Sequence, residues 1–219
     1  MTEKIQSLQD TYIEQIGNGA FDYDHFLEFL LSNRVPYKKK ILNRNICIST
    51  ENKPFKSIYF IDSGVVSCKK EGNIIGFLGG KHIIGLSNPY TKDNAFYTTK
   101  TVQSTCVYEF DRAKMLAMLL SYQFGWLFLY ANNHDKEVML VDKTQLLKEP
   151  AEYRFVTLLK EIARLFGKLR NETIYIPAYF SKTMLASYAN LSTRSINTLC
   201  NDLVQKGVLV FEEESPALA

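Results

Sequence analysis

The stretch SKTMLASYANLSTRSINTLCNDLVQKGVL, residues 181–209, has the pattern of two short helices joined by a tight turn. Ser181 and Ser192 each stand where a helix begins, because a serine hydroxyl can accept a backbone N–H that the first turn leaves unpaired. Asn190 tolerates the positive φ that ends the first helix, and Gly207 has the same role after the second. The stretch therefore predicts a helix pair with a sharp connection.

The second helix of this pair has two chemically different faces. Ile196, Leu199 and Leu203 recur at three- and four-residue spacing, which predicts one buried stripe. The opposite face carries short polar side chains and no acid: Thr193, Arg194, Asn197, Thr198 and Asn201. Such a face fits the major groove of DNA, and the helix N-terminus favours a nearby phosphate. Amphipathic helix pairs are also common in proteins that bind no DNA, so the pattern alone leaves that alternative open.

Composition gives a soluble globular protein, with 219 residues, 46% hydrophobic and 22% charged. This length holds one large domain or two smaller ones. No apolar run reaches the roughly 18–20 residues that span a bilayer, and the N-terminus lacks the basic start and apolar core of a signal peptide. We therefore expect a cytoplasmic protein without a membrane partner. The net charge of +3 is too small to indicate a nucleic-acid partner by itself.

Cysteines and histidines give no support for metal or redox chemistry. They are scattered, without a C-x-x-C pair and without ligand spacing: Cys47, Cys68, Cys106, Cys200, His25, His82 and His134. In a reducing cytoplasm the thiols are expected to be buried or half-buried. No nucleophile–base pair, metal cluster or phosphate loop is present in the sequence, so we expect neither an enzyme nor a resident cofactor or metal.

The order of elements predicts an α+β fold. Residues 1–33 have a helical apolar stripe. Short β-rich runs separated by turn residues follow, at 46–49, 57–62, 65–69, 74–78, 83–86, 96–103 and 106–110. Strands of about five residues at this close spacing indicate a small antiparallel barrel or roll.

A long helix is expected over about 122–147, with a seam of coiled-coil spacing: Leu127, Ala131, His134, Val138, Val141 and Gln145. The seam favours a homodimer through this helix, while packing only on its own barrel remains the alternative. Pro150 ends the helix and marks a hinge. We therefore divide the chain into a sensor domain with the long helix, 1–147, and a second domain, 148–219, in which a helix at 153–168 and a strand at 173–176 precede the helix pair.

This order resembles the CRP/FNR family of bacterial transcription regulators over nearly the whole chain. The likeness rests on the hairpin Ile58–Val66, the turn Gly79-Gly80 leading to Ile83-Ile84-Gly85, the strand Thr105–Phe110 and the helix pair. Residues 79–89 are most similar to the halorespiration regulators, with the virulence regulators second. The resemblance implies a β-roll like that of cyclic-nucleotide-binding domains, a dimerisation helix and a winged helix-turn-helix.

Cyclic AMP is not the effector that the resemblance implies here. Nucleotide-binding members place a Glu directly after the Gly that matches Gly85, and an Arg-Ser pair further on. This chain has Leu86 and then Phe96-Tyr97, and a buried phosphate without an Arg would be uncompensated. Iron–sulfur and haem sensing also lack their ligands. We expect a small, poorly charged, non-nucleotide effector that binds among Gly85, Leu86, Tyr90, Phe96, Tyr97, Tyr130 and His134. The alternative is that no effector binds and that these residues only fill the barrel.

Base contacts are also expected to differ from those of the catabolite regulator, whose Arg and Glu correspond to Thr193 and Arg194, and whose later Arg corresponds to Thr198. We expect Arg194 to read guanine, Asn197 to read adenine, and Thr193 or Thr198 to touch a thymine methyl. Lys182 and Ser192 are expected at phosphate, and Ser195 completes the set. Family members usually carry a two-stranded wing, whereas Val208–Phe211 predicts one strand only.

The function expected from the sequence is a homodimeric regulator that binds palindromic double-stranded DNA and works with RNA polymerase. A ligand would act by favouring one angle between the DNA-binding domains. The alternative is a ligand-binding or protein-interaction module that has lost operator binding, as the missing arginine and the short wing suggest.

Overall fold

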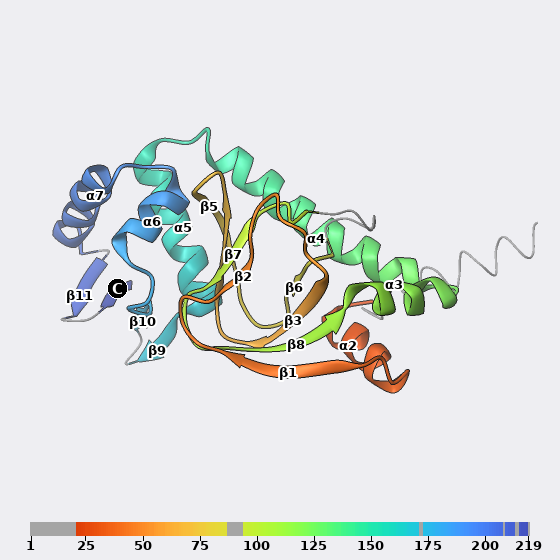
Figure 1. Cartoon of the computed structure of the whole chain (residues 1–219). Coiled ribbons are helices and arrows are strands. Elements are labelled where there is room, and N and C mark those ends of the chain that lie inside the picture. The colour runs from red at the N-terminus through yellow and green to blue at the C-terminus, as the bar shows by residue number, and fades with distance from the viewer. Residues whose placement is uncertain (1–20, 87–93, 171–172, 208, 213–214, 219) are drawn as a thin grey trace, which may run out of the picture.

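A computed structural model describes residues 21–86, 94–170, 173–207, 209–212 and 215–218. In the first part of the chain, two four-stranded sheets face each other as a roll, in the strand orders β1-β8-β3-β6 and β2-β7-β4-β5 (Figure 1). Every strand pair in these sheets is antiparallel. The strands are β1 Tyr37–Leu42, β2 Cys47–Ser49, β3 Ser57–Ser63, β4 Val66–Lys70, β5 Asn73–Leu78, β6 Ile83–Ile84, β7 Thr98–Thr101 and β8 Thr105–Asp111. The expected antiparallel roll is therefore present.

Strand β3 shows why this part folds as a layered roll. Its successive side chains point to opposite faces, and both faces are buried. Ile58 and Phe60 pack outward against the helices, while Ile61 packs inside the roll with Val66 and Val107. The apolar alternation on both sides thus fixes β3 between a helical layer and the roll interior.

Three helices cover the outer face of the β3 sheet: α2 Tyr23–Ser32, α3 Arg112–Ser121 and the start of α4 Gly125–Leu146. Phe26 from α2 stacks on Phe128 from α4 at a centroid distance of 4.5 Å, and its edge meets Phe60 at 5.1 Å. Asp22 and Asp111 begin α2 and α3, because each carboxylate accepts a backbone N–H of the first turn. This aromatic layer attaches the beginning of the long helix α4 to the roll.

The second part contains α5 Ala151–Phe166, β9 Lys168–Arg170, β10 Thr173–Tyr175, α6 Lys182–Ala189, α7 Thr193–Gln205, β11 Leu209–Glu212 and β12 Ser215–Leu218. Its strands form one antiparallel sheet in the order β11-β12-β10-β9. Pro150 lies at the N-cap of α5, where its fixed φ suits a helix start and ends the preceding segment. The expected break between the long helix and α5 is confirmed at this residue.

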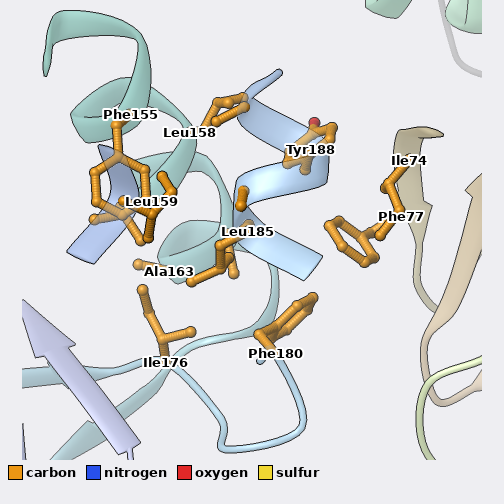
Figure 2. Packing of buried hydrophobic residues seen from close by; sticks show 14 of the residues in the cluster. Ile74, Phe77, Phe155, Leu158, Leu159, Ala163, Ile176, Phe180, Leu185 and Tyr188 are labelled. Atoms are coloured by element: carbon orange, nitrogen blue, oxygen red, sulfur yellow. The ribbon is translucent and has the colours of Figure 1, made fainter. Parts of the chain in front are cut away.

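One hydrophobic core joins the two parts. Val65, Ile74, Phe77 and Val102 of the roll belong to the same buried cluster as the apolar side chains of α5, α6 and α7. Figure 2 shows Phe77 facing Phe180 and Tyr188, with centroid distances of 4.9 and 5.1 Å. The division at 147/148 therefore falls in a short connection between helices, but the packing continues across it.

Several sequence expectations on secondary structure are wrong. Strand β1 was not expected, because its sequence YKKKIL alternates poorly and its side chains are mostly exposed. The helix expected over 153–168 runs from Ala151 to Phe166, and Lys168 begins β9 instead. The single strand expected at 208–211 is a hairpin, since β12 pairs with β11 from Leu209↔Leu218 to Glu212↔Ser215. Of the helix expected over 1–33, residues 1–20 lie outside the described residues.

Cysteine exposure also differs from expectation at one position. Cys68 and Cys200 are buried and Cys106 is half-buried, as expected, but Cys47 is exposed. It lies on the short strand β2, and its thiol donates to the Ser49 carbonyl. Among the described residues no cluster of ligand side chains suits a metal ion, and no helix there is long and apolar enough to cross a bilayer.

Candidate nucleic-acid interface

The helix pair forms with the caps that the sequence predicts. The Ser181 hydroxyl accepts from Met184 N at 3.3 Å, and the Ser192 hydroxyl accepts from Ser195 N at 3.0 Å. Asn190 ends α6 in the left-handed conformation, with φ 52°. These caps satisfy backbone groups at the helix ends and so fix a short, sharp connection between α6 and α7.

Helix α7 buries one stripe and exposes the other. Ile196, Cys200 and Leu203 are buried against α5 and α6. Leu199, expected in the buried stripe, is half-buried at its edge, and Cys200 takes the central place. Thr193, Arg194, Asn197, Thr198 and Asn201 are all exposed, as the pattern predicts. The polar face is therefore presented to solvent by a rigidly packed helix.

Arg194 is exposed on the first turn of α7 and makes no ion pair with any residue that the structure describes. Residues 193–201 contain no Asp or Glu, so no acid of the same face competes for the guanidinium. The Thr198 hydroxyl donates to the Arg194 carbonyl at 3.2 Å, so it is engaged within the helix. The five N–H donors of Arg194 thus remain available to an acceptor outside the chain.

The other expected DNA-contact residues lie near the start of the two helices. Ser192 and Ser195 bond to each other through their hydroxyls at 2.8 Å, and Ser192 is already engaged as a cap. Lys182 is exposed at the first position of α6. Ser192 therefore serves the start of α7 before any partner outside the chain, while Thr193 and Asn197 are exposed on the same helix as Arg194.

The long helix α4 exposes a row of apolar and aromatic side chains. Tyr130, Val138 and Val141 are 55%, 46% and 53% exposed, and the Tyr130 ring is stacked on that of His134 at 6.3 Å between centroids. Leu127, expected at the start of the seam, is instead buried within the single chain, with 2% exposure. Of the expected seam, His134, Val138, Val141 and Gln145 are exposed and Ala131 is half-buried. We call these four exposed residues, together with the exposed Tyr130 one turn before His134, the α4 row.

The residues expected to form one effector pocket lie in three places. Gly85, Phe96 and Tyr97 line a small cavity of about 140 Å³ together with Phe55 and Arg112. Tyr130 and His134 line a different, larger cavity along α4. Leu86 is buried in the aromatic layer with Phe26 and Phe110, and Tyr90 lies outside the described residues. Among the described residues, the expected effector set is therefore divided between two cavities and the aromatic layer.

Sequence reasoning missed the polar groups on the face of α4 that turns toward the roll. Phe128, Asn132, Lys136, Met139 and Lys143 recur at three- and four-residue spacing and are all buried or half-buried. Polar side chains in such a stripe were the available signal, because a helix face packed on a core is normally apolar. A poorly charged pocket was expected because the roll lacks the arginine that would hold a phosphate. The lysines of α4 did not enter that expectation.

Lys143 shows how one of these polar groups is accommodated. Its ammonium donates to the carbonyls of Ile74 and Ile75 at 3.2 and 2.9 Å and lies 3.8 Å from the centre of the Tyr188 ring. Burial lowers its pKa to about 8, although Glu161 opposes this change. The Tyr188 hydroxyl in turn donates to Glu161. Lys143 therefore connects α4, β5 and α6 at one point.

Solved structures share this architecture, although no protein-family model and no curated protein matches the sequence. FixK2 from Bradyrhizobium japonicum superposes with a TM-score of 0.72 at 17% identity, covering 84% of this chain and 92% of its own. The c-di-GMP responsive global regulator CLP from Xanthomonas campestris gives 0.71 at 15% identity, covering 88% and 97%. TTHB099, a transcriptional regulator of the CRP family from Thermus thermophilus, gives 0.68 at 14% identity, covering 82% and 91%.

These identities show the fold alone. The chain has the fold of these CRP/FNR-type transcription regulators over most of its length. Within the chain, a roll precedes a long helix and a C-terminal helix pair.

Proposed function

We propose that this protein is a homodimeric, sequence-specific DNA-binding transcription regulator. The observation that carries the proposal is the exposed face of α7, which holds Arg194 without an ion pair in the described chain and has no acid from Thr193 to Asn201. A buried stripe and two serine caps hold this face rigid, as a helix that reads bases in the major groove requires. The helix pair and the hairpin β11–β12 would together form a winged helix-turn-helix.

Dimerisation is supported by the α4 row. Its exposed apolar side chains run along one side of the helix at coiled-coil spacing, and they gain burial when a second α4 packs against them. A two-fold dimer would place two copies of α7 about 34 Å apart, which matches successive major-groove faces of a palindrome. We propose double-stranded palindromic DNA as the partner, and RNA polymerase as a further one.

In this proposal each exposed side chain of α7 has a distinct role. Arg194 pairs with the O6 and N7 atoms of guanine through two N–H groups, and Asn197 pairs with adenine. Thr193 and Thr198 contact thymine methyl groups. Lys182 holds a phosphate and so fixes position without reading sequence.

The test is selection of bound duplexes from a random DNA pool by the full-length protein, followed by titration of the selected site. Arg194→Ala is expected to weaken binding to the selected site by about 1–3 kcal/mol per half-site and to relax one base position, with non-specific binding retained. Arg44→Ala is the matched control, because Arg44 is an exposed arginine on the roll.

Enrichment of no sequence, or an unchanged footprint for Arg194→Ala beside a normal Arg44→Ala, would refute the reading of α7. The alternative, an interaction module that has lost operator binding, predicts the first of these results. The hairpin β11–β12 removes one reason for that alternative, because a two-stranded wing is available to contact the DNA backbone. We propose that a small effector controls the protein through the contact between the roll and α4. We do not propose a catalysed reaction.

A further inference from the structure

Among the described residues, the two sheets of the roll end in four edge strands: β1, β6, β2 and β5. The outer backbone groups of an edge strand face no neighbouring strand, so such an edge can pair with a strand of another chain. Strands β6 and β2 are only two and three residues long, which leaves little edge to pair with. Strands β1 and β5 are each six residues long, and each would offer a full edge.

These two longer edges differ in charge. Strand β1, YKKKIL, is mostly exposed and carries three consecutive lysines, and two copies of it would bring like charges together. Strand β5, NIIGFL, has no charged residue, and none occurs from Gly72 to Gly80. Uncharged six-residue segments rich in large apolar side chains and without proline are typical of strands that self-associate. The sequence of β5 therefore contains nothing that opposes pairing with a second copy of itself.

Side chains from α4 and α6 occupy the outer edge of β5. The Ile74 N–H donates to the Ser187 hydroxyl of α6 at 2.9 Å. The Lys143 ammonium of α4 donates to the carbonyls of Ile74 and Ile75 at 3.2 and 2.9 Å. The N–H and C=O of one residue in an antiparallel strand point to the same side, so both groups of Ile74 point away from β4. A hydroxyl and an ammonium thus take the place of a neighbouring strand.

The same two helices cover side chains of β5. Ile74 and Phe77 are buried, and the Phe77 ring meets Tyr188 of α6 (Figure 2). A Cβ atom added to Gly76 would lie 3.5 Å from the terminal methyl group of Met139 on α4. Because α6 belongs to the second part of the chain, the cover of β5 depends on the position of the helix pair. The lysines that protect β1, in contrast, are part of the strand itself.

We propose that β5 is a conditional self-association edge: when the helix pair moves away from the roll, β5 pairs antiparallel with β5 of a second copy of this chain. In that pair the backbone of the copy replaces Ser187 and Lys143 as the partner of Ile74, and a two-fold axis relates the strands. Ile74 and Phe77, which the departing α6 uncovers, add apolar surface to the contact. The packing of α6 on β5 therefore keeps copies apart at this edge, independently of the dimer proposed through the α4 row.

The test uses Ser187→Ala with Lys143→Met in the full-length protein, which removes the side-chain bonds to the edge of β5 and keeps most of the packed volume. Backbone groups of Ile74 and Ile75 lose their partners, which should raise the population of the open arrangement by about tenfold or more. Hydrogen exchange of residues 73–78, measured at low protein concentration, should then be faster. In sedimentation the mass should rise with concentration toward about twice the wild-type mass.

Three further variants complete the experiment. Lys148→Met with Ser121→Ala makes the same changes of residue type at exposed positions and should keep the wild-type mass and exchange. Asn73→Lys, added to the double variant, places a lysine at the exposed start of β5, as β1 has. This triple variant should keep the fast exchange but lose the rise in mass. Ser187→Ala alone should show both changes to a smaller extent, so the test does not depend on the double variant folding.

Three results would overturn the proposal. Wild-type exchange at residues 73–78 in the Ser187 and Lys143 variants would show that these side chains do not hold the cover. Faster exchange without a rise in mass would show that the uncovered β5 does not pair. A rise in mass that persists with Asn73→Lys would place the association elsewhere, for example in an exchange of helix pairs between copies. None of these measurements contains DNA, so their outcome is separate from that of the selection of bound duplexes.

Discussion

Replacing Lys136 by Met should make the protein without ligand more stable. Met has a similar length and a high helix propensity, and it brings no buried charge. Burial lowers the pKa of Lys136 from 10.5 to about 8. At about 1.4 kcal/mol for each pH unit, this difference costs the folded state about 3 kcal/mol at pH 7. We therefore expect Lys136→Met to raise the free energy of unfolding by roughly 2–3 kcal/mol.

The direction of this pKa shift determines how the free energy of unfolding changes with pH. Because the pKa is lower in the folded state, the unfolded chain binds more protons between about pH 8 and the ordinary lysine value of 10.5, and wild-type stability rises with pH through this window. The penalty is fully present below about pH 8, so the advantage of Lys136→Met should shrink between about pH 7 and about pH 9.5. Part of the wild-type rise should persist in the variant, since the pKa of Lys143 is also lowered to about 8.

Urea unfolding at these two pH values, at one protein concentration because a dimer's stability depends on it, measures both effects. A variant no more stable than wild type at neutral pH would refute the reasoning, because it would mean that the ammonium is paired or hydrated in solution. Lys148→Met should leave stability within about 0.5 kcal/mol at both values, as expected for an exposed side chain.

Two further perturbations test the interfaces. The double substitution Val138→Glu with Val141→Glu places two acids on the exposed α4 row. In sedimentation it should give a monomer at concentrations where the wild type is a dimer. An unchanged mass would exclude this row as the interface. Phe77→Ala removes a buried ring that contacts Phe180 and Tyr188. It should lower the free energy of unfolding by about 3–5 kcal/mol and speed proteolysis between α5 and α6. A loss below about 1 kcal/mol would show that the ring is not packed there in solution.

Local signals in the sequence predicted the helix pair well. Ser181, Asn190 and Ser192 determine the ends of α6 and α7 through short-range hydrogen bonds and backbone conformation, so their roles can be derived from spacing alone. The outer face of α7 follows in the same way from a strong 3.6-residue period. Its use in binding DNA stays a prediction.

Long-range features could not be predicted from the same signals. Strand β1 is held by its pairing with β8, from Tyr37↔Phe110 to Leu42↔Thr105. The lysine-rich sequence of β1 gives no indication of this partner. Leu127 satisfies a heptad spacing, but it is already buried within the single chain, with 2% exposure. Lys136 became informative only once the structure showed which face of α4 turns toward the roll. In each case the deciding interaction joins residues distant in sequence.

The core that runs from Phe77 to α6 limits how this protein can change shape. Any rotation that separates the roll from the helix pair uncovers apolar surface, and exposure of such surface increases heat capacity. Opening would therefore have an enthalpy that varies with temperature. The balance between the closed and opened forms would therefore shift with warming and cooling, as well as with any ligand that binds only one of the two forms.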